Sequence, residues 1–110
     1  MIKIIILIAI ITLGVIACSS NSGEELIDAA RYGDLETVKL LIENGADIDA
    51  KDKDGYTVLM YASNNGNLEI IKYLVENGAD INIKDKNGDT ALNYARTEGI
   101  KEVLIKTGAK

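Results

Sequence analysis

Apolar residues recur along most of the chain with the spacing of short amphipathic helices. In the clearest run, four of them fall on one face of a helix: Leu68, Ile71, Leu74 and Val75. Asn77 and Gly78 follow this run and favour the left-handed backbone that ends a helix. Before the run, Thr57 can cap a shorter helix that Asn65 and Gly66 end. The pattern therefore predicts two short helices within residues 57–78.

Polar, turn-rich segments separate these helix pairs. Residues 81–88 read Ile-Asn-Ile-Lys-Asp-Lys-Asn-Gly, a composition that favours tight turns. We expect a loop or a β-hairpin there, projecting from the helix pair. Asp47 and Asp80 are expected to bond the nearby backbone, and Asp52 and Asp85 are expected to form turns.

An evenly spaced internal repeat organises the region 24–110. Gly33, Gly66 and Gly99 align at one constant offset, and the segment 43–48 returns unchanged as 76–81. A fixed period of this length is typical of stacked supersecondary units, because each unit buries its apolar face against the next.

The two ends of the repeated region differ from its middle. The first repeat lacks a hairpin and begins with residues 22–25, a capping-box pattern that can satisfy free amides at a terminal helix. In the last repeat, Gly99 and Gly108 are closer together in the chain than Gly66 and Gly78 are, by three positions. We therefore expect three residues to be lost around the turn between the two helices, and the final helix to survive in a shortened form.

The repeat resembles the ankyrin repeat, and the matching pattern consists of Asp52, Gly55, Thr57, Leu59, Ala62, Gly66, Leu68, Ile71 and Leu74, followed by residues 77–82. The resemblance implies an all-α solenoid of about three helix-turn-helix repeats with short β-hairpin loops, at about residues 24–51, 52–84 and 85–110. Val58 and Ala91 replace the family's usual proline, and Met60 and Asn93 replace its usual histidine, which lowers the expected stability.

The segment 1–17 differs in character from the rest. Residues 4–16 form a continuous apolar run, which is too short to cross a hydrocarbon layer of about 30 Å but has the length of a secretory signal. Ala17, Cys18 and a polar stretch follow. This order resembles a bacterial lipoprotein signal, which implies a signal peptide over 1–17, lipidation of Cys18 and a tether over 18–23. The alternatives are an uncleaved membrane helix and a buried or free thiol.

Composition and charge argue against several functions. The chain has 12 basic and 17 acidic residues, a net charge of −5, and no histidine. An acidic chain repels phosphate backbones, so we expect no nucleic-acid binding. Without histidine, the common general base and the common zinc ligand are missing. Residues 50–61 also lack the first and twelfth ligands of a calcium loop. We expect no enzymatic activity, cofactor or metal.

A protein-binding surface is the function that remains. In the ankyrin family the hairpin tips and the exposed side of the first helix contact partners, which implies these candidates here: Arg31, Tyr32, Lys51, Lys53, Asp54, Tyr56, Asn64, Asn65, Lys84, Lys86, Asn87, Asp89, Thr97 and Glu98. Arg31, Tyr32 and Tyr56 are the expected anchors, because large side chains dominate interface energies. Tyr61, Tyr73 and Tyr94 fit the core better.

These observations give a functional hypothesis with two alternatives. We expect a lipid-anchored ankyrin-repeat protein that binds an unidentified protein partner at a bacterial cell-envelope membrane, on the periplasmic or extracytoplasmic side. The first alternative is a self-assembling structural unit whose exposed ends stack on another copy. The second is a secreted or N-terminally membrane-anchored binding module.

Overall fold

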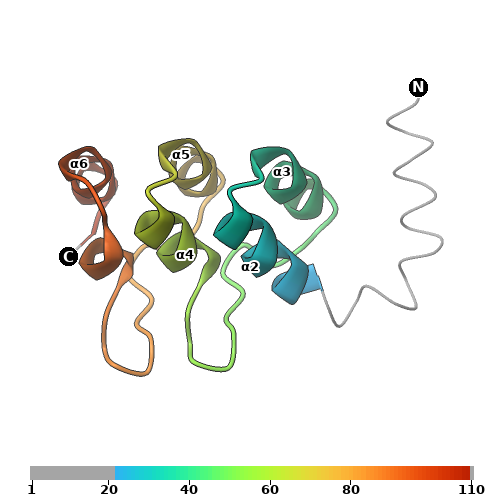
Figure 1. Ribbon diagram of the computed structural model, residues 1–110, viewed down its shortest axis with the longest axis horizontal. Coiled ribbons are helices and arrows are strands. Elements are labelled where there is room, and N and C mark those ends of the chain that lie inside the picture. The colour runs from blue at the N-terminus through green and yellow to red at the C-terminus, as the bar shows by residue number, and fades with distance from the viewer. Residues whose placement is uncertain (1–21, 110) are drawn as a thin grey trace.

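The computed structural model describes residues 22–109. The predicted signal peptide and the predicted lipidation of Cys18 lie outside this range. The helices of the described part are α2 (Ser22–Tyr32), α3 (Leu35–Glu43), α4 (Val58–Asn65), α5 (Leu68–Glu76), the 3₁₀ helix η1 (Ala91–Tyr94) and α6 (Glu98–Lys106). They form three pairs that stack side by side (Figure 1). The predicted all-α repeat fold is therefore confirmed.

The stack has two layers and one set of projecting loops. Helices α2, α4 and η1 form one layer, and α3, α5 and α6 form the other (Figure 1). The two long loops between pairs project to the same side, beyond the first layer. The only β pairing within residues 22–109 is an isolated antiparallel bridge between Lys51 and Thr57. The projections are therefore hairpin-shaped loops without strands.

One apolar core runs through all three pairs. Its largest fully buried side chains come from both layers: Leu26, Val38, Val58, Leu59, Ile70, Ile71, Leu74, Ile100 and Leu104. Each such side chain contributes about 1.5–3 kcal/mol through burial. These buried residues form one cluster that includes all three pairs, so the core is continuous along the stack. Each pair contributes to it by packing on its neighbours. Among residues 22–109, no helix is both long enough and apolar enough to span a bilayer.

Threonine caps begin the first helix of the second and third pairs. Thr57 accepts a hydrogen bond of 3.2 Å from the Met60 amide, and the Met60 sulfur accepts from the Thr57 amide at 3.4 Å. In the last pair, Asn93 accepts from the Thr90 amide at 2.8 Å. The two residues that replace the family's usual histidine thus still provide an acceptor for the capping residue.

The prediction for the end of the chain is wrong in one respect. Helix α6 has nine residues, as does α5, so the final helix is not shortened. The missing residues are instead lost from the first helix of the pair and the turn after it. The 3₁₀ helix η1 has four residues, whereas its counterpart α4 has eight. Thr97 caps α6 through the Ile100 amide as Asn67 caps α5 through the Ile70 amide. Thr97 is thus the counterpart of Asn67, and the match of Gly99 with Gly66 is fortuitous.

The start of the domain also differs slightly from the prediction. Helix α2 already includes Ser22 and Gly23. Ser22 therefore lies within the first turn and not in the capping position that residues 22–25 suggested. Both residues were predicted to lie in the tether over 18–23. Glu24 and Glu25 stay in the first turn, where acidic side chains interact favourably with the helix dipole.

Candidate protein-binding surface

Asp52 holds the first projecting loop in shape. One of its carboxylate oxygens accepts hydrogen bonds from the amides of Asp54 and Tyr56, both at 2.9 Å. The other oxygen accepts from the hydroxyl of Tyr61 on α4. A single side chain thus closes the turn and joins the loop to the helix that follows it.

Asp85 does the same in the second loop. It accepts from the amides of Asn87 at 2.9 Å and Asp89 at 3.0 Å, and from the hydroxyl of Tyr94 on η1. The turn-forming roles predicted for Asp52 and Asp85 are confirmed. Asp47 and Asp80 also bond the nearby backbone as predicted, through the amides two residues on.

These contacts shift the pKa values of the groups that make them. Burial opposes ionisation of Asp52, but hydrogen bonds from Tyr61, Tyr56 and Asp54 and the charge of Arg31 outweigh it, so the Asp52 pKa is lowered. Burial, together with the bond to Asp52, raises the pKa of Tyr61 to about 12. Both groups therefore keep their hydrogen-bonding forms near neutral pH.

The second pair follows the same logic. The hydrogen bond from the Tyr94 hydroxyl is the main cause that lowers the pKa of Asp85. The same bond is the main cause that raises the pKa of Tyr94, and burial adds to it. Both loops are thus held by an ionised carboxylate and a neutral phenol.

The tips of the two loops touch each other. The Lys86 amide donates to the carbonyl oxygen of Asp54 at 3.4 Å. A Cβ on Gly55 would lie 3.3 Å from the Asp85 Cα, so the loops approach closely at this point. Gly55 also has a φ of +83°, a conformation that glycine adopts at little cost. The two tips therefore form one continuous surface.

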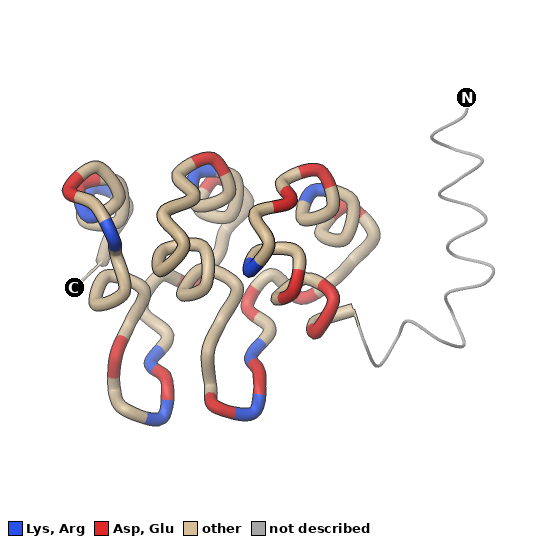
Figure 2. The backbone as a smooth tube through the Cα atoms, viewed as in Figure 1, with Lys and Arg blue, Asp and Glu red and all other residues tan. Residues whose placement is uncertain are grey.

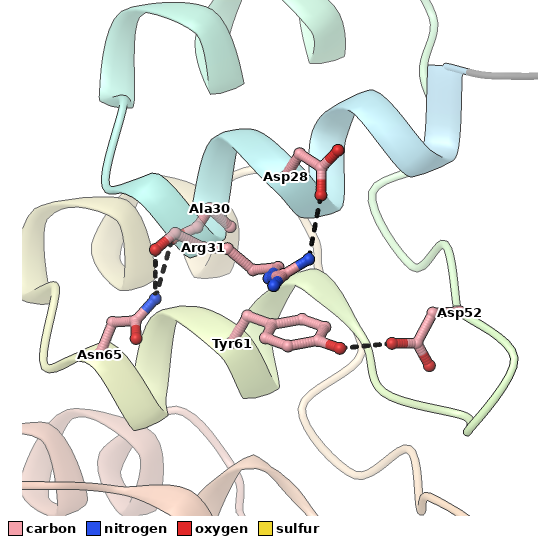
Figure 3. A network of polar contacts seen from close by, with 6 residues as sticks. All are labelled: Asp28, Ala30, Arg31, Asp52, Tyr61 and Asn65. Carbon is pink, nitrogen blue, oxygen red and sulfur yellow. Dashed lines mark hydrogen bonds and ion pairs between the residues drawn. The ribbon is translucent and has the colours of Figure 1, made fainter.

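A row of aromatic rings lies behind these tips. The Tyr56 ring contacts Tyr61 and Tyr94 edge-on, with centroid distances of 5.7 and 5.8 Å. The Arg31 guanidinium lies 5.7 Å from the Tyr61 centroid and pairs with Asp28 at 3.3 Å (Figure 3). Such contacts hold large side chains in one geometry and lower the entropy lost on binding.

The structure separates the candidate residues into three groups. The exposed ones on the loops and the first layer are Arg31, Lys51, Lys53, Asp54, Asn64, Asn65, Lys84, Lys86, Asn87 and Thr97, and Glu98 is exposed at the start of α6 in the second layer. Tyr56 and Asp89 are half-buried within the braced loops. Tyr32 is 80% exposed, but it lies at the end of α2 and not on a loop tip. Tyr61, Tyr73 and Tyr94 are half-buried, between core and surface.

Asn65 and Thr97 are candidates that also stabilise the helices. Asn65 donates to the carbonyl oxygens of Ala30 at 3.3 Å and Arg31 at 2.8 Å, joining α4 to the end of α2 (Figure 3). Thr97 is the cap of α6. The bracing roles of Tyr61 and Tyr94 were missed, although each tyrosine follows its aspartate at the same spacing in both repeats.

The described part shows no arrangement suited to metal chemistry. Within residues 22–109, no cluster of three or more cysteine or carboxylate side chains is placed to hold a metal ion. What the geometry offers is a firmly held polar surface.

Comparison with known proteins places the chain in a family. Residues 26–110 match the family described as ankyrin repeats (3 copies). The chain belongs to the ankyrin-repeat family. Ankyrin repeats imply interaction with other proteins, and proteins of this family are typically binding modules without enzymatic activity.

A relative supports the same assignment over a shorter stretch. A protein of Acanthamoeba polyphaga mimivirus, named as a putative ankyrin repeat protein, is 44% identical over 45 residues. The match covers 41% of this chain and 35% of the relative. This ankyrin-repeat chain thus matches about a third of that protein's length.

Proposed function

We propose that this chain is a lipid-anchored adaptor that uses its projecting loops to bind a protein partner at a bacterial cell-envelope membrane. The observation that carries the proposal is the paired bracing of the loops by Asp52 with Tyr61 and by Asp85 with Tyr94. It holds the exposed tips in one conformation before any partner arrives.

Preorganisation is what makes this surface suited to recognition. An ordered loop loses less conformational entropy on binding than a mobile one, so more of the contact energy appears as affinity. The tips present exposed residues of both charges and an amide: Lys53, Asp54, Lys86 and Asn87. Such a mixture favours a partner with matched polar groups and opposes partners with like charges.

The membrane part of the proposal rests on the sequence of residues 4–18. An acyl chain contributes about 0.8 kcal/mol for each CH₂ that it buries in the bilayer, and two chains give stable anchoring. Confinement to a membrane surface raises the effective concentration of the loops near membrane targets. The anchor and the loops would thus cooperate without touching each other.

The binding surface can be tested in cells that produce the full chain. A photo-reactive amino acid replaces Asp54 or Asn87 at the tips, and Lys72, exposed on α5, serves as the matched control. We expect adducts with a different protein from positions 54 and 87, and not from 72. Adducts of equal yield at all three positions, or none at the tips, would contradict the proposed surface.

The anchor has its own test. Cells are fed an alkyne-labelled fatty acid, and the full chain is purified under denaturing conditions. We expect label on the wild type and none on Cys18→Ala. An unlabelled wild type, or equal label on both proteins, would remove the anchoring proposal and leave the binding surface untouched.

A further inference from the structure

The large apolar side chains that stay exposed lie at the two ends of the stack. Within residues 22–109 they are Tyr32, which is 80% exposed, Leu40, which is 44% exposed, and Ile105, which is 57% exposed. The positions that correspond to them in neighbouring repeats show which way each one faces.

Leu40 lies on the face that would meet a preceding repeat. Its counterpart in the next repeat is Tyr73, whose ring lies 5.8 Å from the Lys39 Nζ of the pair before it. A side chain at this position therefore contacts the preceding pair. For Leu40 no preceding pair is present in the described part of the chain.

Tyr32 has the same orientation in the first layer. Its counterpart in the next repeat is Asn65, which donates to the carbonyl oxygens of Ala30 and Arg31 in the preceding pair. Tyr32 and Leu40 therefore both belong to the N-terminal end face of the stack.

Ile105 lies on the opposite end face. Its counterparts in the second and first pairs are Val75 and Ile42, at the same place in the second helix of each pair. Ile42 is one turn after Lys39, so it shares the helix face with which α3 meets the next pair. Ile42 and Val75 are half-buried against the core, whereas Ile105 has no following pair to cover it within residues 22–109.

The first and last repeats have net charges of opposite sign. Residues 24–51 have eight acidic and three basic residues, residues 52–84 have five and three, and residues 85–110 have four and five. The net charge thus changes from −5 to −2 to +1 along the stack. Acidic residues predominate on α2 and α3, whereas α6 has two acidic and two basic residues (Figure 2).

Charge and apolar residues coincide on each end face. Glu36 is one turn before Leu40 on α3, and Lys101 is one turn before Ile105 on α6. Residues spaced by one turn share one side of a helix. Each face thus has an exposed aliphatic side chain with a charge one turn before it, and the two charges have opposite signs. Within one copy, the Lys101 ammonium also pairs with Glu98 at 3.1 Å, and both side chains of this pair remain partly exposed.

We propose that two copies of this chain associate head to tail, with Ile105 and Lys101 of one copy against Leu40 and Glu36 of the next. The occupant of each face is a second copy, because the opposite end supplies both the apolar group and the complementary charge. Such a contact is heterologous, because it joins two different faces. When two copies have bound, each still has one unoccupied face, so further copies can add and form a chain. The inference does not depend on the partner that the loops bind.

Cross-linking of the full chain tests the geometry. A photo-reactive, apolar amino acid replaces Ile105, and the adducts are digested with trypsin and identified by mass spectrometry. We expect dimers and higher species in which position 105 is joined to residues 32–51 of another copy. The control position is Lys53 at a loop tip, which should give no such species. The absence of dimers from position 105, or links between two α6 helices, would overturn the proposal.

Charge exchange supplies a second, independent test. Glu36→Lys gives a copy with basic groups on both faces, and Lys101→Glu gives one with acidic groups on both. We expect each variant alone to form about fivefold fewer adducts, the effect of roughly one exposed charge pair. Co-expression should restore the wild-type yield, because each variant then meets a complementary face. No recovery in the mixture would overturn the proposed pairing, and circular dichroism of each variant checks that it folds.

Discussion

The side-chain amide of Asn65 donates a hydrogen bond of 2.8 Å to the backbone oxygen of Arg31 in the preceding pair. This bond joins the first two pairs and satisfies a carbonyl at the end of α2, where no helical donor is available. Asn65→Ala should lower the free energy of unfolding by about 1 kcal/mol, the value of one such bond. Chemical denaturation measures it. Asn64→Ala, an exposed neighbour, should change stability little, and equal effects of the two variants would contradict this role.

Ser63 is fully buried, and its hydroxyl has no hydrogen-bond partner within the described residues. The corresponding position in the first pair is Ala30, which is also fully buried. Removing an unsatisfied buried hydroxyl relieves its desolvation penalty, so Ser63→Ala should stabilise the fold by about 1 kcal/mol. The midpoint of urea unfolding should rise while its slope stays constant. A lower midpoint would show that the hydroxyl is satisfied.

Gly55 and Gly78 share a left-handed backbone but differ in their surroundings. Their φ angles are +83° and +89°, and of these two only Gly55 would bring a Cβ within 4 Å of other atoms. Gly78→Ala should cost about 1–2 kcal/mol through backbone strain alone. Gly55→Ala should cost more, because the new methyl group also pushes against Asp85. Thermal unfolding of both variants compares them, and equal losses would mean that the tips do not touch.

The two bracing aspartates predict how stability depends on pH. The pKa of Asp52 and that of Asp85 are lower in the folded state than their ordinary value of 3.8. A group with a lowered folded pKa binds more protons when unfolded, so its stabilisation is present above about pH 4 and is lost as the pH falls further. The double variant Asp52→Asn with Asp85→Asn should be less stable at pH 7 and lose less stability between pH 5 and 2. Asp54→Asn, at an exposed tip, is the control. Parallel curves for wild type and double variant would contradict the prediction.

The repeat pattern predicted most of the helix boundaries because local signals mark them. Thr57 caps α4, Asn65 ends α4 directly before Gly66, and Glu76 ends α5 two residues before Gly78. A cap or a left-handed glycine acts within one turn, so its effect can be inferred from neighbouring residues alone.

The bracing of the loops was harder to infer because it depends on the path of the chain in space. Asp52 and Tyr61 are separated by the loop and the first turn of α4, and only the curvature of the loop brings their side chains together. The wrong prediction of a shortened final helix has a similar cause. Ile100 and Leu104 must cover the preceding pair, so α6 keeps its length and the loss falls on the first helix. Sequence offsets alone do not show which helix carries the packing.

The short η1 helix has a consequence for how the molecule opens. Within residues 22–109 the last pair, like the first, has one neighbouring pair, but it meets that neighbour with a single 3₁₀ turn and one α-helix, whereas the first pair has two α-helices. In a linear stack each pair is stabilised mainly by its neighbours. Amide protons of the last pair should therefore exchange with solvent before those of the first two. A second copy seated over Ile105 would slow that exchange, so the rate at the C-terminal amides would report whether the end of the stack is free or covered.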